Sequence, residues 1–202
     1  NWKDVINGAV KSEDVSRDLL LEALRYFDLV HFAGHSEYNS GDPGQSGWTL
    51  EDGRFTAADI MAMAGAVTLP AFVFSNTCQS ARTAEWAVAD HYQSEIFGLA
   101  NAFLLAGVRH YLGTFWDVPD ESSRQFAMAF YDCLLSRMSI GDAVRCARTK
   151  LIADYGEESI IWAGYVLYGD PLTQYVKPAD AGPDDDSPAA EPDHPVRSST
   201  RK

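Results

Sequence analysis

Short apolar segments alternate with longer amphipathic segments along most of the chain, and this alternation strongly limits the possible folds. The short segments have the near-continuous hydrophobic character of buried parallel strands, whereas the longer ones repeat apolar residues at helical spacing. Strands that alternate with helices form mostly parallel sheets, so we predict an α/β fold: a three-layer sandwich with helices on both faces. The predicted strands span residues 28–33, 71–75, 108–115 and 163–168, and the predicted helices span residues 12–26, 56–64, 94–106, 121–135 and 139–153.

Turn and capping residues mark the ends of several of these elements. Glu51-Asp52-Gly53 separates two strand-like runs, which predicts a hairpin. Thr56 with Asp59, and Ser139 with Asp142, have the spacing of capping boxes that open helices. Asp120 is placed to cap the helix that follows it.

Composition limits the number of domains and the kinds of partner. A chain of 202 residues is long enough for one well-buried α/β domain, which we assign to residues 1–177. Residues 178–202 are acidic, rich in proline and poor in large apolar residues, so we expect a disordered tail. A net charge of −13 argues against direct nucleic-acid binding, and no apolar run approaches the roughly 18 residues of a membrane span. The chain lacks an initiator Met, so we expect it to start inside a longer protein.

The three cysteines are Cys78, Cys133 and Cys146. So sparse and odd a set argues against a disulfide framework and for a reducing compartment, which predicts a cytoplasmic protein. Cys133 and Cys146 lie in helical runs, where we interpret them as small core residues. Cys78 instead follows a predicted strand.

Two reactive side chains follow predicted strands: His35 comes after the strand that ends at Ala33, and Cys78 after the strand that ends at Ser75. Functional groups of open α/β sheets gather beyond the carboxyl ends of strands. If the two strands are neighbours, the imidazole and the thiol face each other as a nucleophilic pair requires. The backbone amides of Ser36 and Cys78 are the candidate donors to an oxyanion.

Two alternatives to this pair remain open. His31 competes as the base, but its position in the middle of a strand favours a core histidine. Zinc held by His31, His35 and Cys78 is also conceivable, although strand residues four apart do not converge on one ion. We expect no cofactor and no metal.

Five ordered motifs resemble those of the CHAT family, a caspase-like domain often found with TPR repeats in bacterial proteins and related to separase. The resemblance covers about residues 15–172. The motifs are Phe32-Ala33-Gly34-His35, Ser75-Asn76-Thr77-Cys78-Gln79-Ser80, Phe103-Leu104-Leu105-Ala106-Gly107-Val108, Phe115-Trp116-Asp117-Val118-Pro119-Asp120 and Tyr168-Gly169-Asp170-Pro171.

The resemblance implies a caspase/separase fold and a cysteine endopeptidase, with His35 as base and Cys78 as nucleophile. The chain departs from the family pattern at Ser36, where Gly is usual. The first strand and helix of the usual domain are missing or precede Asn1. By similarity to separase, residues 115–120 line the substrate pocket, which makes Trp116, Asp117 and Asp120 candidates for binding a basic P1 side chain. The implied partners are a protein substrate and regulatory domains outside this chain; the alternative is a non-catalytic interaction module.

Overall fold

A four-stranded sheet with the order β1-β5-β6-β7 forms the middle of the molecule. The computed structural model describes residues 11–39, 41–77 and 98–176. The first three strands of this order are parallel, and the last is antiparallel to its neighbour. Their bounds are β1 (Leu29–Ala33), β5 (Phe72–Asn76), β6 (His110–Thr114) and β7 (Tyr165–Tyr168).

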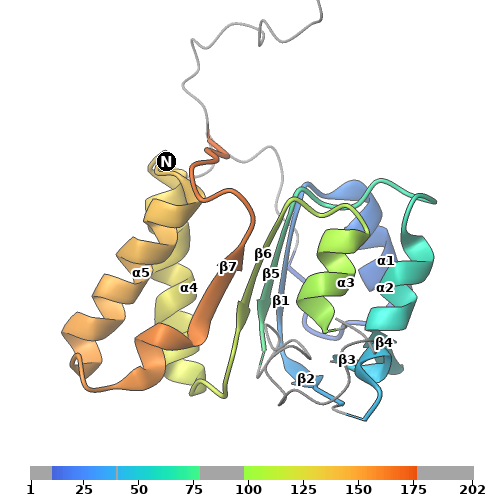
Figure 1. Cartoon of the computed structure of the whole chain (residues 1–202), viewed down its shortest axis with the longest axis horizontal. Helices are drawn as coiled ribbons and strands as arrows, with labels where there is room; N and C mark the ends of the chain where they lie inside the picture. The colour runs from blue at the N-terminus through green and yellow to red at the C-terminus, as the bar shows by residue number, and fades with distance from the viewer. Residues whose placement is uncertain (1–10, 40, 78–97, 177–202) are drawn as a thin grey trace, which may run out of the picture.

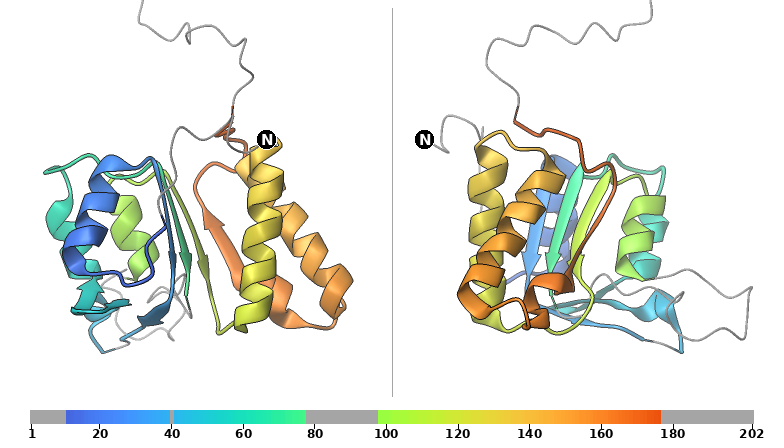
Figure 2. Two further views of the ribbon diagram at one scale, coloured as in Figure 1. Left: turned by 180° about the vertical axis from the view of Figure 1, so that it is seen from behind. Right: turned by 60° about the vertical axis from the view of Figure 1, so that its left-hand side comes forward.

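Helices cover both faces of this sheet, as Figures 1 and 2 show from three directions. One face carries α1 (Arg17–Tyr26), α2 (Ala57–Met63) and α3 (Leu99–Leu105), and the other carries α4 (Asp120–Leu135) and α5 (Ile140–Tyr155). A short 3-10 helix, η4 (Ile160–Gly164), leads into β7. The predicted three-layer α/β architecture is therefore confirmed. No helix within the described ranges is long and apolar enough to cross a membrane.

Alternation along the strands divides the core into two apolar clusters. On β5, Val73 packs into the cluster beneath α1, α2 and α3, whereas Phe72 and Phe74 pack into the cluster beneath α4 and α5. All three side chains are fully buried. Successive strand residues point to opposite faces, so a strand covered on both sides is apolar throughout, as the sequence predicted.

A second, three-stranded sheet lies at the end of the molecule where β1 and β5 terminate (Figure 1). It contains β2 (His35–Glu37), β3 (Gly47–Leu50) and β4 (Gly53–Thr56), and η2 (Pro43–Gln45) lies between the first two strands. The predicted hairpin is the antiparallel pair β3 and β4. Strand β2 was not predicted, because three polar residues give no hydrophobic pattern.

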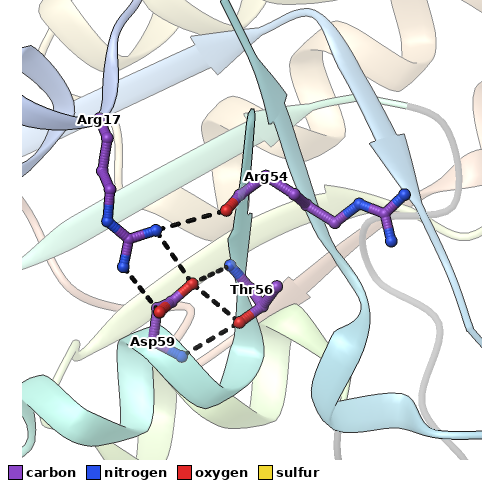
Figure 3. Close-up of polar contacts among 4 residues, drawn as sticks. All are labelled: Arg17, Arg54, Thr56 and Asp59. Carbon is purple, nitrogen blue, oxygen red and sulfur yellow. Dashed lines mark hydrogen bonds and ion pairs between the residues drawn. The ribbon is translucent and has the colours of Figure 1, made fainter. Parts of the chain in front are cut away.

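The predicted capping box at Thr56 is confirmed and belongs to a larger polar cluster, shown in Figure 3. The Asp59 carboxylate accepts hydrogen bonds from the Thr56 backbone N–H at 2.8 Å and from the Arg17 guanidinium at 2.6 and 3.2 Å. These contacts hold the pKa of Asp59 below its usual range, the Arg17 hydrogen bond contributing most. The cluster fixes α1 against the start of α2.

Helices α4 and α5 are joined by a disulfide bond between Cys133 and Cys146. This corrects the interpretation of both residues as unlinked core thiols, and it removes the cysteine-based argument for a reducing compartment. The odd cysteine count was misleading because two of the three residues pair across helices that only the packed fold brings together.

Candidate active site

The neighbouring strands β1 and β5 end at the same edge of the sheet. They pair in parallel with Ala33 opposite Asn76, which confirms the adjacency that the sequence analysis required. The chain passes from β1 through Gly34 to His35, the first residue of β2. On the other side Thr77 directly follows β5. Cys78, the candidate nucleophile, lies outside the described residues, as does its amide.

Ser36, the candidate oxyanion donor on the other side of the site, lies within β2 opposite Trp48 of β3. Among the described residues only Arg137 combines a side chain with a positive φ, so Ser36 sits in ordinary extended backbone. A serine at the position where the family usually has Gly is therefore accommodated without backbone strain.

A pocket of about 660 Å³ opens beside His35 and Thr77. It extends from these residues along the α4 side of β1. Most of its lining residues come from β1, β5 and β6, which end at this edge of the sheet, and from α4, which begins there. The lining residues are His31, Ala33, Gly34, His35, Asn76, Thr77, Thr114, Val118, Asp120, Ser123, Arg124, Ala127, Met128, Tyr131 and Asp132.

His31 lines this pocket instead of lying in the core, which corrects the sequence-based interpretation. Its ring stacks on Phe74 with 4.3 Å between centroids and lies 5.6 Å from Tyr131. Although the residue is exposed toward the pocket, the surrounding protein limits hydration of its charged form, and burial lowers the pKa of His31 to about 4. An imidazole with so low a pKa is a poor proton acceptor at neutral pH.

The end of β5 is held by hydrogen bonds to three other elements. The Asn76 amide donates to the Ser123 carbonyl of α4 at 3.3 Å and accepts from the Tyr165 hydroxyl of β7 at 3.3 Å. The Thr114 hydroxyl of β6 donates to the Thr77 carbonyl. These hydrogen bonds therefore hold Asn76 and Thr77, the last described residues before Cys78.

The sequence analysis missed the hydroxyl groups at this edge. Ser75 and Thr77 are both almost fully buried and contact each other at 3.2 Å, and Thr77 donates to Ser36 at 2.8 Å. One signal was available: residues two apart on a strand share a face, so two hydroxyls at the polar end of an apolar strand belong together. Their partner Ser36 lies 41 residues away from Thr77 and gave no such signal.

The three candidate specificity residues lie in different surroundings. Asp120 lines the pocket. It is the first residue of α4 and Pro119 is the cap, so the prediction that Asp120 caps this helix is wrong. Asp117 is exposed and does not line the pocket. Trp116 is partly buried against the α4–α5 core, and its indole nitrogen lies 3.0 Å from the position that a Cβ on Gly164 would occupy.

Fold comparison places the chain among proteins with a caspase-like α/β fold. Its structure is similar to the crystal structure of the Arg-specific cysteine proteinase gingipain R, with a TM-score of 0.62, 14% identity, and coverage of 82% of this chain and 37% of that one. It is also similar to separase in the Saccharomyces cerevisiae separase–securin complex, with a TM-score of 0.51, 19% identity, and coverage of 78% and 9%. Residues 9–170 match the CHAT domain model, and the chain belongs to this family.

Two curated relatives are large repeat proteins. The chain is 29% identical over 127 residues to human tetratricopeptide repeat protein 28, and 30% identical over 121 residues to the mouse protein. These alignments cover 61% and 58% of this chain, but the matched region is only 5% and 4% of the relatives' lengths.

Proposed function

We propose that this chain is a cysteine endopeptidase in which His35 is the general base and Cys78 the nucleophile. The imidazole takes the thiol proton, and the thiolate attacks the scissile carbonyl. The protonated His35 then gives its proton to the leaving amine, and water hydrolyses the resulting thioester. The backbone amides of Ser36 and Cys78 are the proposed donors to the oxyanion of the tetrahedral intermediate.

One observation carries this proposal. His35 and Thr77 follow adjacent parallel strands, line one pocket, and are linked through the 2.8 Å hydrogen bond between Thr77 and Ser36. The residue after the candidate base thus touches the residue before the candidate nucleophile. The low pKa of His31 supports His35 over His31 as the base.

The experiment compares the wild-type chain with Cys78→Ala and with a Cys133→Ala/Cys146→Ala double variant. Each is incubated with a denatured proteome, and new protein N-termini are identified by mass spectrometry. We expect wild type and the double variant to create the same cleavage sites and Cys78→Ala to create none. Sites that persist with folded Cys78→Ala would contradict the proposal. No sites from any variant would favour the alternative, a non-catalytic interaction module.

For specificity we propose that an acidic residue of the pocket binds a basic P1 side chain. Asp120 is the leading candidate because it lines the pocket, with Asp117 and Trp116 as the other two. A charge-assisted hydrogen bond to a carboxylate contributes about 1.5–3 kcal/mol, which corresponds to a preference of tens-fold or more.

A peptide library tests this preference. We expect cleavage after Arg or Lys, and we expect Asp120→Asn to lower kcat/KM for basic P1 residues by about tenfold or more while leaving cleavage after other residues unchanged. Asp117→Asn tests the second candidate and should have the smaller effect, since Asp117 does not line the pocket. An apolar or acidic P1 preference of the wild type would contradict the proposal.

The proposed partners are a protein substrate and regulatory domains or proteins outside this chain. The regulatory part rests on the tetratricopeptide repeat relatives, in which the matched region is a small fraction of a long chain. A cytoplasmic location also stays a prediction, and the Cys133–Cys146 bond is the observation against it. Cell fractionation tests the location directly.

A further inference from the structure

Four polar groups form a continuous chain of hydrogen bonds at the edge of the sheet where the candidate active site lies. The Trp48 indole N–H donates to the Ser75 hydroxyl at 2.7 Å. Ser75 and Thr77 hydroxyls are 3.2 Å apart, and the Thr77 hydroxyl donates to Ser36 Oγ at 2.8 Å. Because Thr77 uses its proton toward Ser36, its contact with Ser75 is one in which Ser75 donates. We call Ser75, Thr77 and Ser36 the hydroxyl chain.

The hydroxyl chain begins at the closely packed side chain of Trp48. Trp48 is fully buried and stacks on Phe32 with 4.5 Å between ring centroids, and its centroid lies 5.1 Å from that of Phe103. Ser75 is fully buried and Thr77 is 4% exposed. A buried hydroxyl that loses its partner cannot turn to water, so the hydrogen bonds of the buried Ser75 and Thr77 hydroxyls resist displacement, whereas the Ser36 end of the chain is only partly buried.

The contacts also form a closed ring through three strands. Ser36 lies opposite Trp48 where β2 pairs with β3. The hydrogen bonds that start at the Trp48 indole therefore end at a residue that is paired with Trp48 in the small sheet. The ring joins β5 of the large sheet to β2 and β3 of the small sheet. Thr77 is held a second time, because Thr114 of β6 donates to its carbonyl.

The two ends of the hydroxyl chain adjoin the two candidate reactive residues. Ser36 follows His35 in the sequence, and Thr77 precedes Cys78. His35 belongs to the small sheet, whereas Cys78 follows Thr77 and β5 of the large sheet in the sequence. The hydrogen bond between Thr77 and Ser36 therefore joins the two sheets beside both candidate residues.

We propose that Thr77 is a positioning residue whose hydroxyl bond to Ser36 sets the distance between the His35 imidazole and the Cys78 thiol. This inference rests on the proposed function. Thr77 acts through Ser36 on β2, and a shift of about 1 Å in such a pair is enough to lower the rate about a hundredfold.

The test uses the thiolate itself as the readout, so it does not depend on finding a substrate. The full chain is alkylated with iodoacetamide across a range of pH, and the rate is measured at Cys78 by mass spectrometry. A thiol paired with a nearby imidazole ionises below the value of about 8.5 for a free cysteine. We expect wild type to show this low titration.

Thr77→Val keeps the shape of the side chain and removes the hydroxyl. We expect it to raise the apparent pKa of the Cys78 thiol and to lower kcat on cleavable peptides by about 10- to 100-fold with little change in KM. Thr77→Ser restores the hydroxyl and should recover both values. Thr149→Val removes a threonine hydroxyl on the exposed side of α5 and is the matched control.

Ser36→Ala removes the other end of the same bond and serves if Thr77→Val does not fold. Because both substitutions break one contact, we expect the double variant Ser36→Ala/Thr77→Val to be no slower than the slower single variant. A low thiol pKa in wild type that stays unchanged in folded Thr77→Val and Ser36→Ala would overturn this inference alone. An ordinary thiol titration in wild type would overturn both this inference and the proposed function.

Discussion

His31 and His35 are four residues apart on consecutive strands and line the same pocket, but they differ in what surrounds them. His31 stacks on an aromatic ring of the core, and its pKa falls to about 4. His35 begins the small sheet beside Ser36, which contacts the residue before Cys78. The two side chains therefore make a direct pair of variants for identifying the base.

We expect His35→Ala to lower kcat by about 10²–10⁴, the usual cost of removing a general base. His31→Ala should keep kcat within a few-fold, because an imidazole with a pKa of about 4 accepts a proton poorly at pH 7. Steady-state kinetics on one peptide, with circular dichroism to check folding, measures both. Equal losses in the two variants would contradict the assignment.

His31 also predicts how stability depends on pH. The pKa of His31 is about 6.5 when unfolded and about 4 when folded, so between these values the unfolded state binds more protons. Its contribution to the free energy of unfolding is therefore complete above pH 6.5 and is lost as the pH falls toward 4. We expect His31→Gln to flatten the decline of the melting temperature over this window. A decline as steep as that of wild type would show that other groups cause it.

At the scale of elements, the cluster of Arg17, Thr56 and Asp59 joins α1 to the start of α2 (Figure 3). We expect Asp59→Asn to lower the free energy of unfolding by about 1–3 kcal/mol, because it replaces charge-assisted hydrogen bonds in a partly buried site. Since the pKa of Asp59 is lowered in the folded state, the effect should be complete above about pH 4, the ordinary value for an aspartate. It should be lost as the pH falls below that value through the lower pKa of the folded carboxyl. Urea unfolding at two pH values measures this.

Glu121→Gln is the matched control for this prediction. Glu121 pairs with Arg124 on the exposed surface of α4, where water competes for both charges. Exposed pairs contribute little, so we expect almost no change in stability. A similar loss in both variants would mean that general surface charge, not the cluster, is responsible.

Elements with strong hydrophobic patterns were predictable from the sequence, and elements without them were not. Strand β5 was recognisable because burial on both faces makes Phe72, Val73 and Phe74 apolar. The helix predicted from residue 94 begins in the structure at Leu99, and residues 94–97 lie outside the described ranges. Strand β2 has no pattern of its own and exists because β3 offers it a partner.

The same distinction holds in the candidate site. His35 became a candidate because it follows a recognisable strand, and Asp120 because the resemblance pointed to its segment; both residues line the pocket. The contact of Thr77 with Ser36 could not be found, since it depends on how two separate sheets meet. The prediction for His31 was wrong because mid-strand position says nothing about which face of an edge strand stays open.

At the scale of the whole molecule, the Cys133–Cys146 bond ties together the two helices that cover one face of the sheet. It closes a loop of 13 residues, for which the expected stabilisation is about 3 kcal/mol. We expect a reducing agent to lower the melting temperature of wild type. A Cys133→Ala/Cys146→Ala variant should melt at the lower value with or without reductant.

Mass spectrometry without reduction provides the independent check on this prediction. Two free thiols at Cys133 and Cys146 in protein isolated under alkylating conditions would show that the bond is absent in the cell. The same result would restore the cysteine-based argument for a reducing compartment.

The burial of Trp48 has a consequence for how this family diverges. His35 is exposed, so a relative can have another residue there without a cavity in the core. Trp48 is one of the largest fully buried side chains, so a smaller residue at that position would leave a cavity. Truncation of such a residue costs about 3–5 kcal/mol. We therefore expect descendants that have abandoned catalysis to keep this tryptophan. In an alignment, replacements at position 48 should coincide with replacements at position 75, whose hydroxyl accepts the indole N–H, and should be independent of those at position 35.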